Sequence, residues 1–147
     1  MMQNLKQIAD LFAAAPEKRY KGVKSTSQYL TMRDGIQITI DVMLPSDAAP
    51  ETRLPTVMIM ARYWRSMELR VPDQPNKALI GPREAVADYL IPRGFAMVIV
   101  DARGTGASTG VSRYPWSTDE LTDYGEVAAW VATQPWSNGC IGAMGFR

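Results

Sequence analysis

Two short runs of consecutive apolar residues constrain the fold of this chain most. They occupy residues 55–60 and 95–100. Runs of this kind are typical of strands that are buried on both faces, and such strands belong to parallel sheets that helices cover. A helical pattern over residues 83–91 separates the two runs, and Pro92 and Gly94 end it. The sequence therefore predicts two parallel strands joined by a right-handed helical crossover.

A β-hairpin is predicted ahead of these strands, over residues 29–44. Asp34 and Gly35 form a tight-turn dipeptide between two strand-like runs. After the turn, apolar residues alternate with more polar ones, so we expect one buried face and one wetter face. The apolar set is Ile36, Ile38, Ile40, Val42 and Leu44, and the other set is Gln37, Thr39, Asp41 and Met43.

A second helix and a last strand are predicted in the remaining sequence. Ser117 and Glu120 have the spacing of a capping box, and apolar residues recur at helical spacing from 121 to 131. Residues 140–144 resemble another buried strand. The order hairpin, strand, helix, strand, helix, strand predicts an α/β domain over residues 25–147. Residues 1–24 are expected to be a lead-in with a short amphipathic helix over 5–12, and residues 65–82 a long loop.

Composition excludes several classes of protein. With 147 residues, 46% of them hydrophobic, and a net charge of +1, the chain is predicted to be one globular domain that binds neither nucleic acid nor anionic lipid through charge. No apolar run is long enough to span a bilayer and no signal peptide is recognisable, so we expect a cytoplasmic protein without membrane contact. The single cysteine, Cys140, excludes an intrachain disulfide and is expected to be buried. The absence of histidine excludes a serine–histidine pair within these residues.

The pattern G-x-S-x-G occurs once, at residues 106–110. It matches the text of a nucleophile elbow, but an elbow places serine directly between a strand and a helix. Here six residues separate the strand end at Asp101 from Ser108, and no helix start follows, so we interpret Ser108 as a loop hydroxyl that bonds to backbone. Gly104 and Gly106 match the start of the dinucleotide-binding pattern G-x-G-x-x-G, but Thr109 stands where the third glycine is required. This mismatch disfavours nucleotide binding as a function.

Charged and aromatic residues follow both apolar runs, on the side where α/β sheets bind ligands. Asp101 and Arg103 follow the second run, and we expect them to tie a tight loop together through hydrogen bonds. Tyr63 follows the first run. Its hydroxyl is a usable oxyanion donor, although a tyrosine considered in isolation is more often an interface or core aromatic.

Four segments, in order, resemble the N-terminal part of the Xaa-Pro dipeptidyl-peptidase and cocaine-esterase-like (CocE/NonD) hydrolases, a branch of the α/β-hydrolases. They are residues 29–45, 54–63, 94–110 and 123–145. The resemblance implies a partial α/β-hydrolase fold: an N-terminal hairpin, then a mostly parallel sheet with crossover helices, truncated at the nucleophile elbow. It also implies a Ser-Asp-His triad that cleaves esters or amides through an acyl-enzyme.

Two site residues are carried over from this resemblance. Tyr63 matches the tyrosine that helps to form the oxyanion hole, and Arg147 occupies the position of the nucleophilic serine. An arginine stays protonated and cannot accept an acyl group. We therefore expect an inactive N-terminal fragment in which Arg147 is an end artefact. The alternative is a degenerate, non-catalytic domain kept for binding or assembly.

The resemblance leaves the substrate open. A small ester or amide or a peptide is expected in the full-length protein, with no cofactor, metal or nucleic acid. Peptidase, esterase and acylase activities all remain possible, because fold analogy alone does not choose among them.

Overall fold

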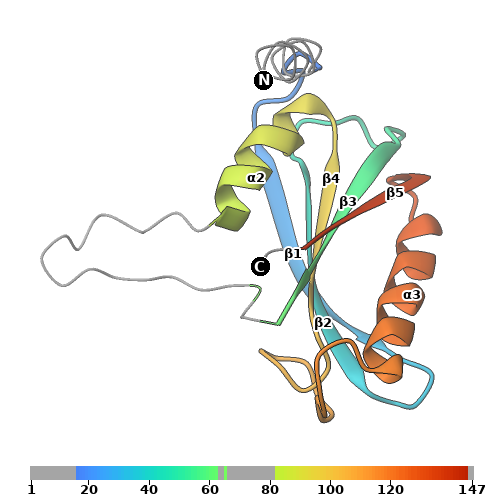
Figure 1. Cartoon of the computed structure of the whole chain (residues 1–147). Helices are drawn as coiled ribbons and strands as arrows, with labels where there is room; N and C mark the ends of the chain where they lie inside the picture. Colours follow the sequence, from blue (N-terminus) through green and yellow to red (C-terminus); the bar gives the residue numbers. More distant parts are fainter. Residues whose placement is uncertain (1–15, 63–64, 66–81, 146–147) are drawn as a thin grey trace, which may run out of the picture.

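A computed structural model describes residues 16–62, 65 and 82–145 (Figure 1). Its centre is a mixed five-stranded sheet with the strand order β1-β2-β4-β3-β5. The strands β1 and β2 pair antiparallel, as do β2 and β4, whereas β3 pairs in parallel with both β4 and β5. The bounds are β1 Val23–Thr31, β2 Gln37–Pro45, β3 Leu54–Ala61, α2 Pro82–Leu90, η1 Ile91–Arg93, β4 Ala96–Asp101, α3 Thr118–Ala132 and β5 Ser137–Gly145.

The predicted hairpin is confirmed. β1 and β2 pair along their whole lengths, and the turn places Gly35 at a φ of 81°, which a glycine adopts without strain. The wetter face expected for β2 is wrong, because Thr39 is 2% exposed and Asp41 is 4% exposed. Contacts with three other parts of the chain account for this. The Thr39 N–H donates to the hydroxyl of Ser108 in the loop after β4, while Ser27 of β1 and Arg65 after β3 contact the carboxylate of Asp41.

The sheet has a separate apolar core on each face, as the alternation of strands and helices predicts. Along β4, Val98 and Val100 pack in the core that includes residues of α3. Met97 and Ile99 lie in the other core, with residues of α2 and η1. All six residues of β4 are buried, because it lies between β2 and β3 and helices cover both faces.

The two helices predicted after the hairpin are both present as α2 and α3. η1 continues α2 and ends at Gly94, which has a φ of 89° and donates its N–H to the Ile91 carbonyl oxygen at 3.1 Å. At the start of α3, the Glu120 N–H donates to the Ser117 hydroxyl at 3.3 Å, so the first half of the capping box is confirmed. The Glu120 carboxylate does not return to the cap. It accepts hydrogen bonds from the Trp116 backbone N–H just before the cap and from the side chains of Tyr124 and Arg62.

The last predicted strand is present as β5, but the expected burial of this strand, including that of Cys140, is wrong, because only Ser137 among its residues is buried. Cys140 is exposed, because β5 pairs only with β3 in the described sheet and forms one of its edges. The helix expected over residues 5–12 and most of the loop expected over 65–82 lie outside the described residues.

Candidate functional site at the carboxyl edge of the sheet

Three parallel strands end together at one edge of the sheet. Met60, near the end of β3, lies opposite Val100 of β4 and Gly145 of β5. The next β3 residue, Ala61, lies opposite Asp101. This edge is where open α/β sheets place their ligands.

Two positions taken from the family resemblance follow these strand ends directly in the sequence. Tyr63 comes two residues after Ala61, and Arg147 comes two residues after Gly145. Both residues lie outside the described part of the chain. The fold therefore brings the residues that lead into both positions to the same edge of the sheet.

Asp101 joins the loops that follow β3 and β4. Its side chain is 1% exposed and accepts the Arg65 backbone N–H at 2.8 Å and the Arg65 guanidinium at 2.9 Å. It also accepts the Ala107 N–H at 3.2 Å. Arg65 lies between two carboxylates, because its Nε is also 3.0 Å from Oδ1 of Asp41. A buried carboxylate that accepts several hydrogen bonds holds its donors in place, so Asp101 ties the two loops together.

Ser108 bonds to backbone on both sides, as predicted. Its hydroxyl accepts the Thr39 N–H at 2.8 Å and donates to the Asp101 carbonyl oxygen at 2.9 Å. The next residue, Thr109, exchanges hydrogen bonds with Gln37, through its hydroxyl at 2.9 Å and its N–H at 2.9 Å. The loop thus continues the pairing of β2 beyond the end of β4. The helix after it begins only at Thr118, so Ser108 does not occupy an elbow between a strand and a helix.

Arg62 is anchored to the start of α3. Its guanidinium donates to the carboxylate of Glu120, whose side chain is fully buried. Glu120 also accepts the Tyr124 hydroxyl at 2.7 Å and the Trp116 N–H at 3.3 Å. The Trp116 ring lies 6.0 Å from the Arg62 guanidinium carbon. Burial, followed by the hydrogen bond with Glu120, raises the pKa of Tyr124.

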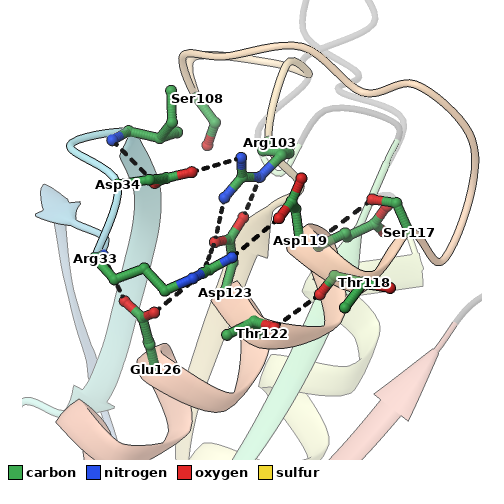
Figure 2. A network of polar contacts seen from close by, with 12 residues as sticks. Arg33, Asp34, Arg103, Ser108, Ser117, Thr118, Asp119, Thr122, Asp123 and Glu126 are labelled. Carbon is green, nitrogen blue, oxygen red and sulfur yellow. Dashed lines mark hydrogen bonds and ion pairs between the residues drawn. The ribbon is translucent and has the colours of Figure 1, made fainter.

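A third network joins the hairpin turn to α3, and Figure 2 shows it. The Arg103 guanidinium donates two hydrogen bonds of 2.6 Å to Asp123, whose side chain is 1% exposed. It donates a third, of 2.9 Å, to Asp34 in the turn. Arg33 extends the network, donating to Asp119, Asp123 and Glu126 at 3.1 Å each.

These contacts shift the pKa values of the network in the direction expected for ion pairs. The hydrogen bond with Asp123 raises the pKa of Arg103, and the hydrogen bond from Arg103 lowers the pKa of Asp34. The expectation that Asp101 and Arg103 together tie one tight loop is thus confirmed only for Asp101, which binds Ala107. Arg103 instead reaches the hairpin and α3.

The sequence reasoning missed Glu120 and Asp123 as partners of these arginines. Both are buried on α3, together with Tyr124, Val127 and Val131. The sequence did contain a signal for these partners. Glu120 and Asp123 lie on the same side of the predicted helix as its apolar residues, and charged residues are rarely fully buried unless they are paired.

The comparisons with known proteins agree with this geometry. The family described as X-Pro dipeptidyl-peptidase (S15 family) matches residues 34–146. This chain belongs to that family. A Mycobacterium bovis protein named as a serine esterase is 40% identical over 135 residues, which cover 86% of this chain and 21% of the relative. The cocaine esterase of a Rhodococcus species is 28% identical over 114 residues, which cover 78% of this chain and 17% of the relative.

Solved structures show that this member of the S15 family has part of the CocE/NonD hydrolase fold. A CocE/NonD family hydrolase from Staphylococcus aureus matches with a TM-score of 0.62 and 27% identity, covering 82% of this chain and 22% of that one. An α-amino acid ester hydrolase shares the fold, with a TM-score of 0.58. The chain spans about a fifth of the length of the curated serine-esterase relative.

Residues 16–62, 65 and 82–145 contain no group of three or more acidic or cysteine side chains that could hold a metal ion. Within the same part of the chain, no helix is long and apolar enough to cross a membrane.

Proposed function

We propose that this chain is the N-terminal part of a serine hydrolase that cleaves ester or amide bonds through an acyl-enzyme. The observation that carries the proposal is the register at the sheet edge. Met60 of β3 lies between Val100 of β4 and Gly145 of β5. The strand that leads to the oxyanion position, β3, therefore ends beside the strand that leads to the nucleophile position, β5. Membership of the S15 family and the serine-esterase relatives support the same reaction class.

In the proposed mechanism, a serine oxygen attacks the substrate carbonyl carbon and its proton passes to a histidine. The Tyr63 hydroxyl donates a hydrogen bond to the oxyanion that forms. This chain has arginine at position 147, where the family has its serine, and contains no histidine. The triad is therefore assigned to the longer protein, and residues 1–147 alone are expected to be inactive.

Assays of matched forms of the protein test this proposal. Residues 1–147 should not hydrolyse p-nitrophenyl acetate above background, and Arg147→Ser alone should not restore activity because the histidine is still missing. A form extended with its native downstream sequence should hydrolyse the ester and bind a fluorophosphonate probe at one serine. Labelling of Ser108 in residues 1–147 would contradict the proposal.

The alternative function is a degenerate, non-catalytic hydrolase domain used for binding or assembly. The absence of the triad from residues 1–147 is the observation that favours it. The reading frame after codon 147 separates the two functions, because only the enzyme needs the aspartate and the histidine downstream. An extended form that folds but neither hydrolyses esters nor binds the probe would support the alternative.

The substrate class within this proposal is an ester, an amide or a peptide. Parallel assays with a p-nitrophenyl ester and an aminoacyl-prolyl p-nitroanilide would rank esterase against dipeptidyl-peptidase activity by kcat/KM.

A further inference from the structure

The strand β1 forms one edge of the described sheet, where it pairs with β2 alone. Its nine cross-strand pairs follow one another without a bulge, and β1 contains no proline and one charged residue, Lys24. Edge strands of soluble proteins commonly carry several charges, a proline or a bulge, which prevent another strand from pairing. β1 has little of this protection, so its free edge is suited to accept a further strand.

The backbone groups at this free edge belong to the odd-numbered residues of β1. At the hairpin turn, the Met32 N–H donates to the Ile36 carbonyl oxygen at 2.8 Å. On the other side of β2, the N–H and the carbonyl oxygen of Gln37 both bind Thr109. Hydrogen-bonded and non-hydrogen-bonded pairs alternate along an antiparallel ladder. The even-numbered residues of β1 therefore bind β2, and the odd-numbered residues point their N–H and C=O groups away from it.

We propose that the β1 edge binds the β1 edge of a second copy of this chain, antiparallel, in a two-fold symmetric dimer. Thr26 lies at the symmetry axis, opposite Thr26 of the second copy. A two-fold interface uses the same patch on both subunits, so the strand has to match its own sequence read in reverse. This inference does not depend on the proposed function, because no residue at the carboxyl edge of the sheet takes part.

The apolar side chains of β1 match each other in this register. Val23 and Tyr29 are 44% and 57% exposed, which is unusual for side chains of this size in a strand. Because they are six positions apart, they lie on the same face of β1. With Thr26 at the axis, Val23 of each copy lies opposite Tyr29 of the other, and an aromatic side chain beside a β-branched one stabilises a cross-strand pair.

The polar side chains select the same register. With Thr26 at the axis, Lys24 lies opposite Gln28 of the second copy, so no like charges meet. An axis at Lys24 would place two lysines directly opposite each other, which is destabilising. An axis at Ser27 would place Tyr29 opposite Ser25 and leave the apolar side chains unmatched. A second copy is therefore a better occupant of this edge than an unrelated strand.

Disulfide cross-linking of the extended form, with Cys140→Ser as the background, tests the register. The Cα atoms of a non-hydrogen-bonded antiparallel pair are about 4.5 Å apart, a separation that a disulfide spans. Thr26→Cys should therefore form a covalent dimer under mild oxidation. Lys24→Cys is the matched control on the same face of β1, because its two copies would be more than about 10 Å apart. The yield on a non-reducing gel should be at least about tenfold higher for Thr26→Cys.

A charge exchange at position 26 tests the interface without a covalent bond. Thr26→Lys and Thr26→Glu each place like charges opposite each other at the axis, and each should weaken dimerisation about fivefold or more. An equimolar mixture of the two variants should restore dimerisation, because the paired charges are then opposite. Sedimentation velocity measures the association, and circular dichroism confirms that both variants are folded.

Three results would overturn the proposal. An extended form that stays monomeric at every concentration would mean that another part of the longer protein, or nothing, covers β1. A dimer that is insensitive to both charges at position 26 would place the interface elsewhere. Cross-linking through Ser27→Cys in preference to Thr26→Cys would show that the register is wrong.

Discussion

Gly106 lies directly against the carboxylate of Asp101. A Cβ at position 106 would come within 2.3 Å of Oδ2 of Asp101, and Gly106 has a φ of 54°, in the left-handed region. Any side chain at position 106 would therefore have to displace a buried charged group that anchors two loops. This contact is a sufficient reason for a glycine at position 106, so the glycine does not indicate a phosphate-binding loop.

Gly106→Ala should lower the free energy of unfolding by about 2 kcal/mol or more, through backbone strain and displacement of Asp101. Gly125→Ala is the matched control, because a Cβ at Gly125 meets no atom within 4 Å and the residue lies inside α3. The control should increase stability by up to about 1 kcal/mol. Urea unfolding measures both changes, and equal effects in the two variants would contradict the packing argument.

Asp123→Asn should destabilise the protein by about 3 kcal/mol, because it leaves the buried Arg103 without its charged, two-bond partner. Asp119→Asn is the control. The Asp119 side chain is 58% exposed and makes one ion pair with Arg33, so its loss should change stability by less than about 1 kcal/mol. A similar loss of stability in both variants would show that burial does not set the strength of this network.

The stability of the protein should fall in acid in part through Asp34. The hydrogen bond from Arg103 lowers the pKa of Asp34 in the folded state, so this contribution is complete above the ordinary pKa of about 4. It is lost as the pH falls through the folded pKa. NMR titration should place the titration midpoint of the Asp34 carboxyl group below about 4. The Asp34→Asn variant should lose less stability than the wild type between neutral and acid pH. A midpoint at or above the ordinary value would refute the assignment.

Tyr124 should resist ionisation in alkali for as long as the protein stays folded. Burial raises its pKa above the ordinary value of about 10, so its contribution to stability is complete below that pH and is lost as the pH rises through the folded pKa. Ultraviolet titration at 295 nm should show one tyrosine that ionises only on unfolding. Tyr124→Phe should abolish that late transition, and an unchanged titration curve would assign it to another residue.

Cys140 in residues 1–147 should react with Ellman's reagent in the folded state, because it is exposed on β5. The reaction rate should be close to that of the urea-unfolded chain. Protection of the thiol until unfolding would mean that another surface covers β5 in solution.

The strands, the helices and the hairpin were predictable because each has a local signature. The apolar runs of β3 and β4, the turn at Asp34 and Gly35, and the cap at Ser117 all act over a few residues. The ionic partners were not predictable in this way, because Arg33 and Asp123 are 90 positions apart in the sequence and only the fold brings them together. The contact of Thr39 with Ser108 was missed for the same reason, since the two residues are 69 positions apart in the sequence.

The separation between Arg33 and Asp123 also has a consequence for biosynthesis. At about 5–20 residues per second, a ribosome needs roughly 5–20 seconds to add the 90 positions between the turn and its helical partner. Until the residues of α3 are added, the Arg33 guanidinium lacks the carboxylates of Asp119, Asp123 and Glu126. The turn is therefore expected to reach its final conformation only after the segment that forms α3 has left the exit tunnel.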